Sequence, residues 1–391
     1  MISSIFLAWL QLIHNRTRFV ATLGGVAFIV VLIFMQVGFQ DGLYDSSVKV
    51  HESLQGNLFL TSTQYKSLTS LQSFPRTRLY QTLAFDEVAS VSPVYVQFGK
   101  LKNIDTGRKS SIYVIGINPS KPTFHRTDIN QNVHHLQRPD VAIYDQDSRP
   151  EFGPISKTFE QGGTTHIEVS PYTEVTLSTR LEIAGLFTMG PSFGVDGNLI
   201  TSSSTFLRTF RERKVAEIDI GLVTLLPSAD ARQVQKSLVA NLPKDINVLT
   251  LPEFISLEKH YWSERTPIGF VFRLMVAMGF IVGIGIAYQI LYSNISTHLV
   301  EYATLKAIGH TNRYLLGMIF QQALVLATLG SIPGVIISTL LYGATRHVTH
   351  LPVIMTADKI LLVLSSVFAM CLISAALASQ KLRSADPADI F

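Results

Sequence analysis

Four long runs without a charged side chain dominate the hydrophobic pattern of this 391-residue chain. They cover residues 19–40, 274–300, 314–345 and 360–380. A helix needs about 20 mostly apolar residues to cross the hydrocarbon core of a membrane, and each run is at least that long. A single such run could be a buried core helix, but four in one chain predict four transmembrane helices.

The residues between the first and second runs follow a different pattern, in which apolar and polar positions alternate between turn residues. Alternation predicts strands, and apolar positions three or four residues apart predict helices. We expect the order strand, helix, strand, strand, and later strand, helix, strand, at residues 56–61, 76–88, 90–101, 110–117, 217–226, 229–241 and 246–251. This order predicts a split ferredoxin-like unit in two pieces, 51–117 and 217–251, within one extracytoplasmic domain over 41–266.

The insertion between these two pieces, residues 118–216, is rich in strand signals and in turn-forming residues. Its expected strands lie at residues 141–144, 166–169, 174–177 and 181–187. We therefore expect an α-helical membrane protein with four transmembrane helices and an α+β extracytoplasmic domain. The insertion would form a small, mostly β subdomain of that domain.

Two helical segments are expected beside the spans. Residues 1–18 carry apolar side chains at helical spacing, which predicts an amphipathic helix on the cytoplasmic face of the membrane. The alternative is a plain extension of the first span, 19–40. Residues 252–273 predict a helical stalk that leads into the second span and is kinked near Pro267, so that stalk and span together cover 267–297.

Glycines mark two places in the predicted spans. Gly279 and Gly283 in the second span have the small-xxx-small spacing that lets helices approach closely, within one chain or across a dimer. The third run is too long to cross a ~30 Å hydrocarbon core as a straight perpendicular helix. Gly330 and Pro333 predict a bend near its middle.

Composition and charge agree with a membrane protein. Only 15% of the residues are charged, against roughly 25% in soluble domains, and the small net charge of +4 gives no reason to expect nucleic acid. Lys and Arg concentrate near one end of the spans, at Arg16, Arg18, Lys306, Arg313, Lys381 and Arg383. By the positive-inside rule this predicts cytoplasmic termini, including the tail 381–391, and a large periplasmic domain. We expect a multi-pass protein of the plasma (inner) membrane, in contact with membrane lipids.

Motifs for nucleotide binding and for a zinc protease are missing from the sequence. It contains no phosphate-binding G-x-x-x-x-G-K-[ST] and no H-E-x-x-H, and the four runs hold no ionisable carboxylate or cation for an ion pathway. His134, His135 and His166 fit no metal-ligand spacing, and we interpret them as surface histidines. Cys371 is the only cysteine, which excludes a disulfide within the chain. We therefore expect no catalytic residue, no metal and no cofactor.

A short polar segment, residues 298–313, lies between the second and third runs, and the bilayer would fix its position from both sides. Its first part predicts a helix that ends at Gly309, because glycine is a common residue just after a helix. Apolar residues recur along this helix at a spacing that forms a stripe able to enter a groove of a partner protein, at Leu299, Tyr302, Leu305 and Ile308. The alternative is a solvated loop helix without a partner.

The same segment carries a family resemblance. Residues 301–309 read EYATLKAIG and resemble the E-[YIV]-A-x-L-[KR]-A-[ILM]-G signature of FtsX/MacB-type ABC transporter permeases, most similarly the cyanobacterial DevC subgroup. The resemblance implies a homodimer with a porter-like outer unit, in which a coupling helix over 298–313 contacts a separate ATP-binding cassette ATPase. The residues implied for this interface are His298, Glu301, Tyr302, Leu305, Lys306, Ile308 and Gly309.

The resemblance also implies a function. We expect the permease subunit of an ABC exporter, in which ATP hydrolysis by a separate chain moves the extracytoplasmic domain. The DevC-like subgroup implies lipid or glycolipid-type cargo, a membrane-fusion adaptor protein and an outer-membrane channel. The alternatives are an FtsX-like regulator of a cell-wall hydrolase, a lipoprotein-extracting permease, and a membrane sensor whose outer domain binds a ligand.

Overall fold

A computed structural model describes residues 16–172, 178–192 and 194–384, and the chain divides into two compact units. The helical unit contains the described residues before Leu43, Pro267–Thr349 and the described residues from Val353 onward. The α+β unit contains Leu43–Thr266 and His350–Pro352. Most of the expected amphipathic helix over 1–18 and the expected strand over 174–177 lie outside the described residues.

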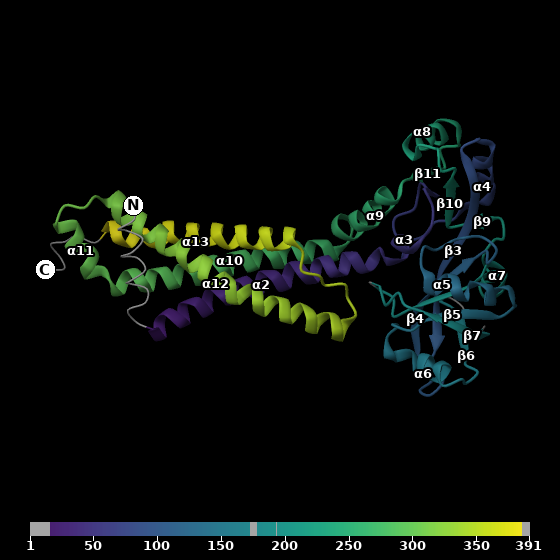
Figure 1. The fold of residues 1–391 in the computed structure, drawn as a ribbon, viewed down its shortest axis with the longest axis horizontal. Helices are drawn as coiled ribbons and strands as arrows, with labels where there is room; N and C mark the ends of the chain where they lie inside the picture. Colours follow the sequence, from purple (N-terminus) through teal and green to yellow (C-terminus); the bar gives the residue numbers. More distant parts are fainter. Residues whose placement is uncertain (1–15, 173–177, 193, 385–391) are drawn as a thin grey trace. The chain divides into compact units, whose positions relative to one another are not determined.

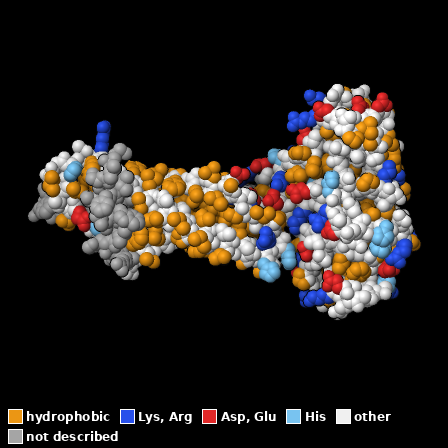
Figure 2. All heavy atoms as spheres, viewed as in Figure 1, with side chains coloured by type: hydrophobic (Ala, Val, Ile, Leu, Met, Phe, Trp, Pro, Cys, Tyr) orange, Lys and Arg blue, Asp and Glu red, His pale blue; other side chains and the backbone are white. Residues whose placement is uncertain are grey.

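Among the described residues, four helices are long and apolar enough to span a membrane. They are α2 (Arg16–Ser47), α10 (Pro267–Thr297), α12 (Asn312–Thr349) and α13 (Ala357–Ser384), shown in Figure 1. Hydrophobic side chains cover much of their visible face, as expected for a surface in contact with lipid (Figure 2). The protein is a multi-pass membrane protein, as the four charge-free runs predict.

Two irregularities were expected in these helices, a kink near Pro267 and a bend near the middle of the third span. The helical path is interrupted before Pro267: α9 (Leu251–His260) is followed by a π-helical turn, η4 (Tyr261–Arg265), and α10 then starts at Pro267. In contrast, α12 continues as one 38-residue helix through Pro333. The helix also extends beyond the apolar run 314–345 at both ends.

Small residues let the spans pack closely on α2. Cβ atoms added to Gly330 and Gly334 of α12 would come within 2.5 Å of Val26 and 2.6 Å of Val30. Tyr342 of α12 then donates a hydrogen bond to a backbone carbonyl of α2. In a membrane, such close approach provides the van der Waals contact that holds helices together.

The α+β unit is built on a four-stranded antiparallel sheet in the order β11-β1-β10-β3. Its elements in chain order are β1 (Leu58–Ser62), α4 (Arg76–Gln81), η1 (Thr82–Ala84), β3 (Val88–Lys102), β10 (Ile220–Leu225), α8 (Ala231–Asn241) and β11 (Ile246–Leu249). Counting only these strands, the spatial order is 4-1-3-2, which is the ferredoxin-like arrangement predicted from the sequence. The predicted helix over 76–88 is shorter than expected, because the α-helical part ends at Gln81.

Strand β3 is long enough to belong to a second structure, a closed ring of six strands. Its first half pairs with β10, and its second half pairs with β4 on one side and β6 on the other. The ring runs β3-β4-β8-β5-β7-β6 and returns to β3. Its other strands are β4 (Lys109–Ile117), β5 (Val141–Asp145), β6 (His166–Pro171), β7 (Thr179–Phe187) and β8 (Asn198–Ser202).

The pairing in this ring places the start of the β-rich insertion earlier in the chain than predicted. The sequence assigned residues 110–117 to the ferredoxin-like piece, but β4 pairs with the second half of β3 and with β8, and with no other strand of the four-stranded sheet. The insertion therefore begins inside β3 rather than at residue 118. The physical reason is the 15-residue length of β3, which exceeds what the four-stranded sheet can pair.

Short elements cover the sheet and the ring. They are α3 (Lys49–Ser53), β2 (Phe74–Pro75), α5 (Thr127–Asn132), η2 (Val133–Gln137), η3 (Pro150–Phe152), α6 (Ile155–Glu160), α7 (Ser203–Thr209) and β9 (Glu217–Ile218). Strand β1 is buried on both faces, so Leu58 and Leu60 enter one hydrophobic core while Phe59 enters a second core with Phe254 of α9. The second core places α9 against the base of the sheet.

Candidate functional site

The polar segment between the second and third spans forms a separate short helix, α11 (Leu299–Ala307). Helix α10 ends at Thr297, and His298 breaks the helical path with φ −101° and ψ 19°. Helix α12 starts at Asn312. The segment between the two spans therefore folds as a nine-residue helix that is connected to a span at each end.

A Schellman motif ends α11. Gly309 has φ +103°, a conformation that glycine adopts without penalty. Its amide donates to the carbonyl of Lys306 (3.1 Å), and the amide of His310 donates to the carbonyl of Leu305 (3.1 Å). These two bonds satisfy carbonyl groups at the helix end that would otherwise lack a partner. The helix stop predicted at Gly309 is present.

The inner face of α11 packs on the helical unit through Tyr302. Its side chain is 1% exposed and its hydroxyl lies 3.5 Å from Oε1 of Gln322 in α12. Ala303 beside it is also buried. Burial raises the pKa of Tyr302 to about 12, so its hydroxyl stays protonated at neutral pH. Tyr302 anchors α11 to α12, which corrects the expectation that it belongs to the stripe facing a partner.

The outer face of α11 is formed by other residues. Val300 is 57% exposed and Ile308 is 73% exposed, and Glu301 and Thr304 lie between them on the same face. The imidazole Nδ1 of His298 lies 2.9 Å from a carboxylate oxygen of Glu301. This face offers two apolar side chains and a carboxylate to an approaching protein.

Three of the predicted interface residues, Leu299, Leu305 and Lys306, are half-buried and lie outside this face. The sequence interpretation missed Val300 and Thr304. A usable signal was present, because Val300, Thr304 and Ile308 follow one another at intervals of four, on the side of the helix opposite Tyr302 and Lys306. Identification of Tyr302 as the buried residue would have defined the outer face.

The two glycines predicted for helix packing lie at close approaches inside the helical unit. A Cβ on Gly279 would collide with the amide of Gln36 in α2. A Cβ on Gly283 would lie 2.7 Å from the sulfur of Met370 in α13 and 3.1 Å from Ile29 in α2. Both glycines therefore lie at close contacts between helices of the same chain.

A buried polar cluster in the α+β unit joins the helices next to two of the spans in sequence. In this Glu258 cluster, the carboxylate of Glu258 accepts hydrogen bonds from the hydroxyl of Tyr65 (3.0 Å), the amide of Leu68 (2.9 Å) and the indole of Trp262 (2.9 Å). His51 Nε2 lies 3.1 Å from the Tyr65 hydroxyl and 3.5 Å from the same carboxylate. The cluster ties α3, which follows α2, to α9 and η4, which precede α10.

The central residues of this cluster are buried, which stabilises their hydrogen bonds. His51 is fully buried and Glu258 is 1% exposed. Burial raises the pKa of Tyr65 well above its usual range, and the charge of Glu258 raises it further, so the hydroxyl remains a donor. The sequence held a signal for this cluster, because Phe254, Glu258 and Trp262 share one face of a helix at intervals of four. A carboxylate on an apolar helix face points to a buried partner.

Within the described residues, the three histidines considered as metal ligands form no metal site. The rings of His134 and His135 are 3.9 Å apart in η2, and His166 starts β6. Among residues 16–172, 178–192 and 194–384, no group of three or more His, Cys, Asp or Glu side chains is arranged to hold a metal.

Comparison with protein families gives one match. Residues 273–387 match the family model described as FtsX-like permease C-terminal. This region, which contains α11 and most of the spans on either side of it, is therefore similar to the C-terminal part of FtsX-like permeases. A comparison with curated proteins finds no match.

Solved structures resemble part of the chain at low identity. The periplasmic region of MacB from Actinobacillus actinomycetemcomitans matches with a TM-score of 0.33 and 13% identity, over 50% of this chain and 88% of that one. The extracellular domain of the noncanonic ABC-type transporter YknZ from Gram-positive bacteria matches with a TM-score of 0.32 and 13% identity, over 50% of this chain and 99% of that one.

Proposed function

We propose that this chain is the permease subunit of an ABC exporter and that the outer face of α11 is where a separate ATPase subunit binds. In this arrangement α11 and both termini are cytoplasmic, and the α+β unit lies outside the membrane. The observation that carries the proposal is the geometry of α11, a short helix held between two spans in the region that matches FtsX-like permeases. Val300 and Ile308 give its outer face two exposed apolar side chains that a bound ATPase subunit would cover.

The contacts of α11 support the transmission of force. Tyr302 fixes α11 on α12, and the Schellman motif at Gly309 keeps its last turn intact. A push on the outer face would therefore displace α11 as one body rather than unwind it. The displacement would pass along α10, whose chain leads back through η4 to α9 and the Glu258 cluster.

Two copies of the chain with two ATPase subunits would form the working complex. We further propose a lipid or glycolipid-type cargo, a membrane-fusion adaptor and an outer-membrane channel, which follow from the resemblance of residues 301–309 to the DevC-like subgroup. The six-stranded ring supports an exporter over a hydrolase regulator, because it enlarges the α+β unit well beyond its ferredoxin-like sheet.

The test replaces the outer face of α11 and leaves its anchor in place. The double variant Val300→Asp and Ile308→Asp puts two carboxylates into the proposed interface, where loss of two apolar contacts is expected to weaken ATPase binding roughly tenfold or more. Co-purification with the candidate ATPase and permease-stimulated ATP hydrolysis are measured in lipid nanodiscs.

The matched control is Ile104→Asp, because Ile104 is 67% exposed in the α+β unit and the change is the same. The control is expected to bind and stimulate the ATPase as the wild type does. Normal coupling by the double variant would show that α11 does not receive the ATPase.

A further inference from the structure

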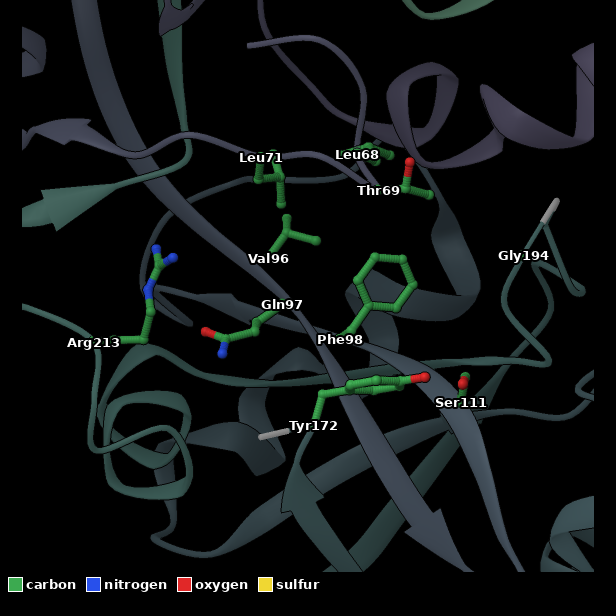
Figure 3. Close-up of a pocket in the computed structure, with 10 residues that line it drawn as sticks. All are labelled: Leu68, Thr69, Leu71, Val96, Gln97, Phe98, Ser111, Tyr172, Gly194 and Arg213. Atoms are coloured by element: carbon green, nitrogen blue, oxygen red, sulfur yellow. The ribbon is translucent and has the colours of Figure 1, made fainter. Parts of the chain in front are cut away.

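A pocket of about 570 Å³ opens on the α+β unit where β3 passes from the four-stranded sheet into the ring (Figure 3). This volume lies in the range of small-molecule sites, which is roughly 300–1,000 Å³. Every contributing element belongs to the α+β unit, and α11 takes no part. The pocket therefore raises a question separate from ATPase coupling.

One part of the pocket is apolar. Leu68 and Leu71 come from the loop after β1, and Val96 and Phe98 come from β3. Figure 3 shows the two leucines on the opposite side from Phe98, so that the space between them is bounded by hydrocarbon. The Phe98 ring lies 4.7 Å from that of Tyr113, a contact that restrains it. Such a surface accepts an alkyl chain in preference to water.

The other part carries polar groups whose hydrogen-bonding capacity is incompletely used. Arg213 donates to both oxygens of the buried Asp219 at 2.7 Å, and both bonds come from Nη2. A guanidinium has five N–H donors, and the described residues provide no acceptor for those on Nε and Nη1. Gln97 donates through Nε2 to Glu212, while its buried Oε1 has no partner among the described residues.

These groups define the chemistry of a complementary molecule. The free donors of Arg213 call for a carbonyl or carboxylate oxygen, and Gln97 Oε1 calls for an N–H or O–H donor. The ion pair with Asp219 already neutralises much of the guanidinium charge, which favours a head group that is neutral or singly negative. An alkyl chain at Leu68, Leu71 and Phe98 would complete the fit.

We propose that this pocket binds a single-chain amphiphile whose head group combines a carbonyl or carboxylate acceptor with an amide or hydroxyl donor. The acyl chain lies between the loop after β1 and β3, and the head group lies at Arg213 and Gln97. The pocket is a binding site of the α+β unit in its own right and needs no ATPase to be filled.

The experiment uses the full chain in lipid nanodiscs and a photoreactive N-dodecanoylglycine with a diazirine in its acyl chain. This probe has both an amide donor and a carboxylate acceptor. After irradiation, labelling is mapped by mass spectrometry on the tryptic peptide of residues 67–76, which contains Leu68 and Leu71. Labelling there is expected to saturate and to be competed by unlabelled N-dodecanoylglycine.

Two variants and a matched control test the position of the ligand. Leu71→Trp fills the apolar part and is expected to lower labelling at least fivefold. Gln97→Leu removes the unpaired acceptor without adding bulk and is expected to weaken binding about three- to tenfold. Leu83→Trp makes the first change at a position 47% exposed outside the pocket and is expected to leave labelling unchanged.

The arms of the experiment separate the possible results. Probe preloaded into the nanodisc bilayer and probe added from solution distinguish a membrane source from an aqueous source of the same ligand. Labelling that does not saturate, or that persists unchanged in both Leu71→Trp and Gln97→Leu, would overturn the proposal. The Val300→Asp and Ile308→Asp double variant is expected to label as the wild type does, so failure of ATPase coupling cannot imitate failure of this site.

Discussion

The two units of this protein bury their polar groups in different ways. Among its described residues, the α+β unit buries three carboxylates, on Asp145, Asp219 and Glu258, and each accepts hydrogen bonds from segments distant in sequence. Asp219, for example, accepts from the amide of Val96 at 2.8 Å and from Arg213 at 2.7 Å. Charges buried in this way fix the segments around them, because each lost partner leaves an uncompensated charge.

The described part of the helical unit has no buried ionisable side chain apart from Tyr302, Tyr342 and the thiol of Cys371. Its buried hydroxyls mostly bond within their own helix: Ser331 donates to Ala327 and Ser338 donates to Gly334, both four residues earlier. Ser374, which donates to the carbonyl of Ile284, is a link between helices. Contact between the spans rests mainly on small residues and hydrocarbon.

The difference assigns different mechanical roles to the two units. Hydrocarbon packing is non-directional, so helices held by it can shift against one another without breaking specific bonds. The Glu258 cluster cannot shift without separating a buried carboxylate from its donors. Movement received at α11 is therefore expected to pass through small shifts of the spans against one another and to move the α+β unit as a rigid body.

The largest effect is expected from removal of the buried carboxylate at Glu258. Glu258→Ala leaves Tyr65, Trp262 and the Leu68 amide without their acceptor. Loss of one partner from a buried charged cluster costs about 3–5 kcal/mol, which corresponds to a fall in melting temperature of roughly 6–20 °C. The measurement is thermal unfolding followed by Trp fluorescence of the full chain in nanodiscs.

The control for Glu258 lies in the other unit. Ser374→Ala removes a single neutral hydrogen bond between spans and is expected to cost about 1 kcal/mol. If the two variants lose equal stability, the contrast between a charge-linked unit and a hydrocarbon-packed unit is wrong.

An effect of similar size, but confined to the local contact, is expected where α11 meets α12. Tyr302→Ala removes a ring that is 1% exposed, and truncation of buried aromatic residues costs about 3–5 kcal/mol of the local contact. The amides of Leu299–Ala307 are expected to exchange with deuterium much faster, and ATPase stimulation is expected to fall with them. Hydrogen exchange measured by mass spectrometry reports the first effect separately from the second.

Tyr302→Phe separates the contribution of the ring from that of the hydroxyl. The phenylalanine keeps the ring and loses only the 3.5 Å contact to Gln322, which is long for a hydrogen bond. We expect less than about 1 kcal/mol of change. A loss as large as that of Tyr302→Ala would mean that the hydroxyl, rather than ring packing, holds α11 in place.

The sequence was sufficient for features with a strong one-dimensional signal. Charge-free runs predicted four spanning helices, and the order of strands and helices predicted the ferredoxin-like sheet, because both depend on spacing along the chain. The helix stop at Gly309 was predicted on the same basis, since glycine suits a positive φ. These features follow from local patterns that tertiary contacts do not override.

Features that depend on contacts between distant segments could not be predicted in this way. Closure of the six-stranded ring requires β6 to return to Gly99–Lys102 of β3, more than 60 residues earlier. The inward position of Tyr302 depends on Gln322 in another helix. Alternation along a strand, or apolar spacing along a helix, defines faces but does not say which face meets which neighbour.

The smallest effect tests how closely α11 depends on its own last turn. Gly309→Ala meets no atom within 4 Å, so its only cost is φ +103°, which disfavours any side chain by about 1 kcal/mol. The amides of Gly309 and His310, which close the Schellman motif, are expected to exchange about fivefold faster. Gly317→Ala is the matched control, because Gly317 also has open space around it but lies within α12. There alanine favours the helix by roughly 0.5–1 kcal/mol and should slow exchange. Faster exchange in both variants would place the weakness in the junction of α11 and α12 as a whole, whereas opposite signs would locate it at the helix stop.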